Sequence, residues 1–95
     1  MIVRISGEGQ YRVDDAQHAH LNQLDDAVVA AVEGDDEDGF HASFEELLAF
    51  VRKHGAVLGE DELEASDVIL PPADTSFVEA GEEFTGEGLI PEPAA

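Results

Sequence analysis

The clearest hydrophobic pattern in the chain lies between Phe40 and Gly55. Apolar residues recur there at the i, i+4, i+7, i+8 and i+11 positions that share one face of a helix, namely Phe40, Phe44, Leu47, Leu48 and Val51. Basic residues fill the predicted last turn, and Gly55 can end the helix in the left-handed conformation. The pattern predicts an amphipathic helix that begins near Glu37, with Phe50 off its main face.

A second apolar stripe precedes it, formed by Leu21, Leu24, Val28 and Val32. Asp14 or Asp15 can cap the start of this helix, which we expect to run to about Glu33 and to end at Gly34. The acidic connector between the two helices, residues 34–39, is short. Short connections favour antiparallel neighbours, so the two stretches predict a helical hairpin.

The N-terminus has the alternation of a β-hairpin. Two short β-rich runs, residues 2–5 and 10–13, flank four residues that include Gly7 and Gly9. Tyr11 and Val13 should point to one face of the hairpin and Arg12 to the other. Residues 68–70 form a further short strand, ended by two prolines, and we expect it beside the hairpin.

The remaining segments carry weaker patterns. Residues 56–64 favour an ordered loop or a single turn. Ser76 and Glu79 have capping-box spacing and predict a short helix to about Phe84. The predicted class is therefore α+β, with an N-terminal β-hairpin, an antiparallel two-helix hairpin, a short third strand and a short C-terminal helix. We expect one domain, residues 1–91, followed by a disordered tail, residues 92–95.

Charge narrows the range of partners. The 95 residues include 23 acids and four Lys or Arg, for a net charge of −19. Direct binding to nucleic acid or to anionic lipid is disfavoured, because both carry the same sign of charge. The composition is similar to that of proteins from salt-loving archaea; the alternative is an ordinary acidic bacterial protein. With no cysteine, no signal-peptide pattern and no long apolar run, the expected location is the cytoplasm.

The acidic connector raises the question of a cation site. If Gly39 takes the sixth position of a calcium loop, then Asp36, Asp38 and Glu45 fall at ligand positions three, five and twelve. Gly34 would then stand at the first position, where it cannot ligate, and the helix would have to unwind to bring in Glu45. We therefore predict no metal site, and these three residues remain the alternative.

Catalytic chemistry has little support in the sequence. Acid pairs are expected by chance in a chain this acidic, and no nucleophile is flanked by a base. The glycines around Glu8 lack the following helix and the counter-charge of a phosphate loop. We predict no catalytic residues, no cofactor and no enzymatic activity.

Four segments together resemble the PspA-associated domain family (PspAA). They are MIVRISGEGQYRVDD at residues 1–15, LNQLDD at 21–26, SDVILPP at 66–72 and GEGLIP at 86–91, in this order along nearly the whole chain. The polar residues 17–20 and the strong acidity depart from the family pattern. The resemblance implies an accessory of the phage-shock, envelope-stress response that works beside PspA, a coiled-coil, ESCRT-III-like protein that coats stressed membranes. It brings no catalytic residues.

Two functions remain open at this point. In the first, the chain is an adaptor that binds PspA, modulates its membrane-maintenance role and is recruited through it to the inner face of the membrane. In the second, it is a small acidic domain that senses an ion or ligand through residues 34–45.

For the adaptor, we predict a contact surface on the hairpin. It comprises Arg4, Tyr11 and Arg12, with Gly7 and Gly9 shaping the loop, and the edge of the hairpin could pair with a partner segment. The alternative is that both arginines pair with nearby acids such as Asp14 or Asp15. The oligomeric state is left open.

Overall fold

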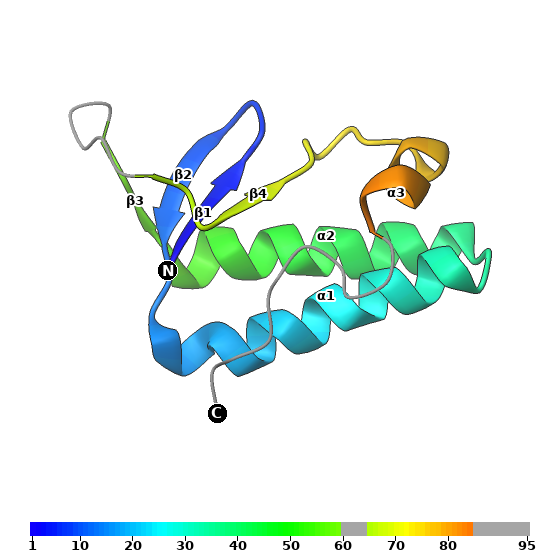
Figure 1. The fold of residues 1–95 in the computed structure, drawn as a ribbon, viewed down its shortest axis with the longest axis horizontal. Helices are drawn as coiled ribbons and strands as arrows, with labels where there is room; N and C mark the ends of the chain where they lie inside the picture. Colours follow the sequence, from blue (N-terminus) through cyan, green and yellow to red (C-terminus); the bar gives the residue numbers. More distant parts are fainter. Residues whose placement is uncertain (60–64, 85–95) are drawn as a thin grey trace.

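The computed structural model describes residues 1–59 and 65–84. The elements follow in the order β1 (Ile2–Ile5), β2 (Gly9–Arg12), a 3-10 turn (Asp15–Gln17), α1 (His18–Glu33), α2 (Glu37–His54), β3 (Ala56–Val57), β4 (Val68–Leu70) and α3 (Phe77–Glu83). A small sheet lies on one side of the two long helices, and α3 lies beside the sheet over the other half of α2 (Figure 1). The predicted α+β class is confirmed.

The sheet has four strands in the order β3-β2-β1-β4. β1 and β2 form the predicted antiparallel hairpin, and β4 is the predicted strand beside it, parallel to β1. Gly7 (φ 85°) and Gly9 (φ 139°) give the connecting turn its left-handed backbone conformations. Because β3 and β4 occupy both edges of the hairpin, our expectation that a hairpin edge is open to a partner was wrong.

The strand β3 was not predicted. Its two residues, Ala56 and Val57, continue directly from α2 and pair antiparallel with β2. Both side chains are exposed, so the strand shows no alternation of buried and exposed positions. A two-residue strand without such a pattern cannot be distinguished from a loop by its sequence.

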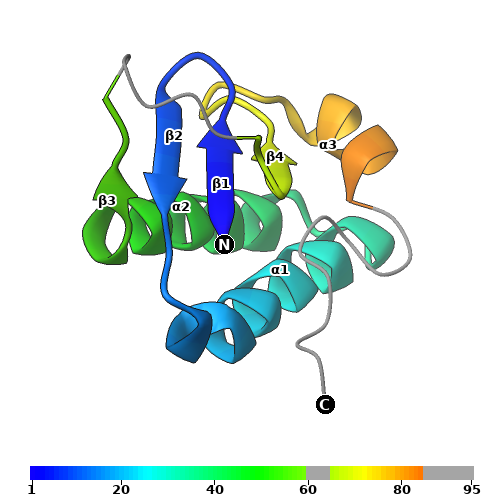
Figure 2. The same cartoon turned by 60° about the vertical axis from the view of Figure 1, so that its left-hand side comes forward.

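The core lies between the sheet and the helical hairpin (Figure 2). The five residues of the predicted α2 stripe are all buried. The inward residues of the sheet, Val3, Ile5, Val13, Val68 and Leu70, pack against them together with Leu21, Leu24 and Val28 of α1. Both amphipathic patterns therefore identified the faces that the helices bury.

The helix α2 also buries a second side. Phe50, which we expected off the main face, is only 9% exposed. Its ring lies between those of His20 and His54, with centroid distances of 4.5 Å to each. The sheet packs on one side of α2 and α1 on another, so a single stripe underestimates the apolar surface that this helix covers.

Two helix ends differ from prediction. Gly55 is extended (φ −86°, ψ 147°) instead of left-handed, because the chain leaves α2 straight into β3. At the start of α1, residues 15–17 form a 3-10 turn, and the Asp14 side chain makes no capping hydrogen bond. Helix α2 begins at Glu37 as predicted, with Asp36 as its N-cap.

Ser76 is the N-cap of α3, as the predicted capping box requires, but Glu79 reaches back to the Ser76 hydroxyl. The Ser76 hydroxyl accepts a hydrogen bond from the Glu79 backbone N–H at 3.2 Å and donates to Glu79 Oε1 at 3.0 Å. Aromatic contacts join this short helix to α2, with Phe84 edge-on to Phe44 and Phe77 tilted against Phe40, both at 5.7 Å. The predicted disordered tail, residues 92–95, lies outside the described residues.

Candidate protein-binding surface

The face of the sheet that points away from α1 and α2 carries an unusual group of side chains. Arg4 in β1 stands opposite Gln10 in β2 and Ile69 in β4, so the three lie in one row across the sheet. Arg12 follows Gln10 by two residues and shares the same face. We call Arg4, Gln10, Arg12 and Ile69 the outer sheet face.

This face combines exposed apolar surface with positive charge. Ile69 is 58% exposed, whereas its neighbours Val68 and Leu70 are buried. Arg4 is exposed, and its side chain forms no hydrogen bond or ion pair with any residue that the structure describes. Arg12 is exposed too, but it is not free of intramolecular interactions. Arg4 therefore does not pair with Asp14 or Asp15, as the alternative proposed. Asp15 Oδ1 lies 3.8 Å from the Met1 ammonium instead.

Tyr11 does not join the two arginines. It lies on the inner side of the sheet, opposite Val3 and Val57, and packs half-buried against the core. The prediction that Tyr11 and Arg12 point to opposite faces is confirmed. A single partner on the outer sheet face would reach Arg4 and Arg12 but not Tyr11, while Gly7 and Gly9 act only through the shape of the turn.

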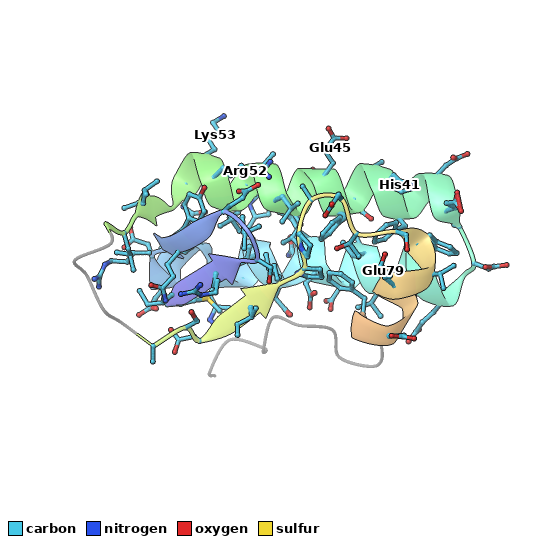
Figure 3. All side chains as sticks on the ribbon, turned by 90° about the horizontal axis from the view of Figure 1, so that it is seen from above. His41, Glu45, Arg52, Lys53 and Glu79 are labelled. Atoms are coloured by element: carbon cyan, nitrogen blue, oxygen red, sulfur yellow. The ribbon has the colours of Figure 1, made fainter. Side chains whose placement is uncertain are left out.

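An ion pair that the sequence did not indicate ties the hairpin turn to α2. Arg52 Nε donates to Glu8 Oε2 at 2.9 Å, and its Nη2 donates to the other carboxylate oxygen. Arg52 is labelled in Figure 3, on the side of α2 that faces the hairpin. The hydrogen bond and charge of Arg52 hold the pKa of Glu8 below its ordinary value, and Tyr11 adds to this shift. The same pairing raises the pKa of Arg52.

Arg52 is one of the four Lys and Arg residues of the chain, and this pairing engages it within the molecule. We therefore do not count Arg52 among the partner contacts. The two side chains are 44 residues apart in the sequence, and the family-like segment at residues 1–15 contains Glu8 but not Arg52. No local signal could have identified the pair.

The acidic connector is built as a helix start. Asp36 Oδ1 accepts a hydrogen bond from the Gly39 backbone N–H at 3.0 Å, and Asp38 lies in the first turn of α2. Glu45 lies in the third turn, which is helical and not unwound. Across residues 1–59 and 65–84, no three His, Asp or Glu side chains are grouped so that they could hold a metal ion.

A buried acid in α1 is a further feature that our sequence analysis missed. Asp25 in α1 is fully buried, whereas the adjacent Asp26 is exposed. Asp25 takes part in an interaction, and every buried side-chain nitrogen or oxygen in the described part of the chain has a hydrogen-bond partner. Its environment is therefore that of a satisfied structural group. Asp25 stands four residues after Leu21 and three before Val28, so the helical spacing places it on the buried stripe of α1 and places Asp26 off it.

None of the helices in the described part of the chain is long and apolar enough to cross a membrane. Neither the comparison with curated proteins nor that with solved structures found a match. The comparison with family models did: the model described as PspA-Associated protein (PspAA) matches residues 1–92. Because this match covers nearly the whole sequence, the chain belongs to the PspA-associated protein family.

Proposed function

We propose that this chain is a non-enzymatic accessory of the phage-shock response that binds PspA and modulates its membrane-maintenance role. The family supports PspA as the partner. The single structural observation behind the proposal is the outer sheet face, where an exposed arginine lies beside an exposed isoleucine.

Contact with a partner protein would be energetically favourable for both of these side chains. Burying Ile69 against a partner removes apolar surface from water at about 25 cal/mol per Å². Arginine is enriched at protein interfaces, where its planar group can bind a carboxylate through two hydrogen bonds. On the coiled-coil surface expected of PspA, an acidic residue could bind Arg4 while an apolar residue next to it packs on Ile69.

The whole-chain charge favours a protein over a lipid partner. At a net charge of −19, the chain is repelled by an anionic membrane surface. In this proposal PspA makes the membrane contact, and the accessory reaches the inner face of the membrane only through PspA. The docking uses a face of the sheet, since both edges of the β-hairpin are occupied.

The test is co-purification of PspA with the folded chain in high salt. The double variant Arg4→Glu with Arg12→Glu should lose PspA while keeping its circular dichroism spectrum. Lys53→Glu is the matched control for Arg4→Glu alone, because it makes the same charge change at an exposed site on α2. This control should retain PspA.

Two outcomes contradict the proposal in different ways. If wild-type chain and purified PspA do not associate at any salt concentration that keeps both folded, the proposed partner is wrong. If the double variant retains PspA at the wild-type yield, the partner stands and the docking face lies elsewhere.

A further inference from the structure

Two adjoining hollows run along the edge of the sheet beside α3. The first, of about 230 Å³, lies between β4 and α3, and its lining includes Ser6, Ile69, Pro71, Pro72, Glu79 and Glu82. The second, of about 540 Å³, shares Ser6 and Pro72 with it and continues to the hairpin turn and to Asp74. We call the two together the β4–α3 trough.

The trough has an apolar floor and an acidic wall. Ile69 offers its exposed side chain on the β4 side, followed by the buried Pro71 and the exposed Pro72. Glu79 and Glu82 stand three residues apart on α3, a spacing that places both on one side of the helix. Glu79 is labelled in Figure 3, beside the loop that joins β4 to α3. No cation lines either hollow, among the residues that the structure describes.

The backbone of the trough argues against an added β-strand as its occupant. β4 is the last described strand at this end of the sheet, so its outer edge is unpaired by any described strand. Only three residues belong to it, and Pro71 and Pro72 follow directly. Proline has no N–H to donate, so a ladder of backbone hydrogen bonds could not continue beyond Leu70. Side chains, therefore, must supply most of the recognition.

We infer that the β4–α3 trough binds a basic amphipathic segment of a partner protein. An aliphatic side chain of the segment packs on Ile69 and the prolines, and a lysine or arginine lies between Glu79 and Glu82. The negative charge of Glu79 and Glu82 is complementary to that lysine or arginine. Ile69 adds an apolar contact, which an acidic surface that only faces water would lack. This inference goes beyond the proposed function, because it specifies the chemistry of the segment whichever protein provides it.

The trough also gives the bound segment a direction. Ile69 belongs both to the floor and to the outer sheet face, where Arg4 is its neighbour in β1. The surface thus changes sign from Arg4, across Ile69, to the two glutamates of α3. A segment with its acidic residue toward β1 and its basic residue toward α3 fits, and the reversed segment brings like charges together.

The experiment uses a synthetic amphipathic helix of leucine and lysine as its probe, with a leucine–glutamate helix for comparison. Titration is followed through the backbone amide signals of the full chain in 1 M KCl. The Debye length is then about 3 Å, so long-range attraction to an acidic protein is screened and contact pairs remain. The lysine peptide should shift the amides of Ser6, Ile69 and Glu79, and the glutamate peptide should not.

Matched variants separate the trough from general acidity. Glu79→Gln with Glu82→Gln removes two charges from the wall and keeps an oxygen that can accept from Ser76. It should weaken binding of the lysine peptide about 5-fold, as expected for two exposed ion pairs. Asp26→Asn with Glu33→Gln removes two exposed charges from α1 and should leave the affinity unchanged.

The inference is overturned if both double variants bind the lysine peptide equally, if the shifts spread over the acidic surface, or if the folded chain binds no lysine peptide. A chain that binds the peptide in the trough yet does not retain PspA would support this inference and contradict only the proposed partner.

Discussion

At the scale of single residues, Gly55 and Gly81 have opposite surroundings. A Cβ atom on Gly55 would lie 2.6 Å from the Val51 carbonyl oxygen and 2.8 Å from Tyr11 Cβ, at the junction of α2 and β3. A Cβ atom on Gly81, within α3, would meet nothing within 4 Å in the part of the chain that the structure describes. Close backbone approach thus explains a glycine at position 55, and no such constraint acts at position 81.

Alanine at these two positions should therefore change stability in opposite directions. Gly55→Ala should lower the free energy of unfolding by about 1–3 kcal/mol, because the added methyl group must displace backbone or the Tyr11 side chain. Gly81→Ala should raise it by about 0.5 kcal/mol, through the better helix propensity of alanine. Denaturant unfolding measures both. A Gly55→Ala midpoint at or above that of the wild type would show that the junction relaxes freely.

At the scale of elements, the Glu8–Arg52 ion pair holds the hairpin turn on the last turn of α2. Since the pKa of Glu8 is lowered in the folded state, the stability that this pair adds is fully present above the ordinary carboxyl pKa of 4.5. It is lost as the pH falls from there through the lower folded pKa. Both side chains are partly exposed, so the contribution should be at most about 1 kcal/mol.

The measurement compares wild type with Glu8→Gln. The difference between their free energies of unfolding should be constant above pH 4.5 and should shrink toward zero below it. Glu33→Gln removes an exposed carboxylate from α1 and is the control for the loss of one negative charge. A wild-type advantage that persists unchanged to the lowest pH at which both fold would mean that the pair contributes nothing through its charge.

The elements that the sequence predicted are those with a local pattern. Both long helices, the hairpin and β4 follow from periodicity or from flanking turn residues, and α3 follows from its capping box. The strand β3 has two exposed residues and no such pattern. The conformation of Gly55 and the burial of Phe50 depend on what lies next to α2 in space, which no local spacing records.

The candidate surface likewise has a part that local patterns predicted and a part that they did not. Alternation along β2 was enough to separate Tyr11 from Arg12. The row formed by Arg4 and Ile69, and the trough between β4 and α3, required the parallel pairing of segments far apart in the chain. The sequence pattern placed this strand beside the hairpin, but it could not supply the parallel orientation or the register of the pairing.

At the scale of the whole molecule, like-charge repulsion opposes a core built from few apolar residues. The net charge of −19 is spread over 95 residues, and salt screens it over about 10 Å at 0.1 M but only about 3 Å at 1 M. We expect the melting temperature to rise steeply between 0.1 and 2 M KCl. Thermal melts followed by circular dichroism measure it, and a flat profile would rule out adaptation to high salt.

A charge-reduced variant is the control for this effect. Asp26→Asn, Glu33→Gln and Glu46→Gln remove three exposed charges from the two long helices. This variant should melt higher than the wild type at 0.1 M KCl and should gain less from added salt. If its profile runs parallel to that of the wild type, salt acts on hydration of the core and not on repulsion.

The parallel pairing of β1 with β4 also sets an order of events during synthesis. The backbone N–H of Ile2 donates to Asp67, 65 residues later in the chain, whereas both long helices and the other partner of β1 are complete by residue 54. At 5–20 residues per second, the ribosome needs roughly 3–13 s to make those 65 residues. During that interval one edge of β1 has no strand to pair with. The nascent domain therefore passes through a state in which this edge of β1 is open, and the pairing of β4 covers it.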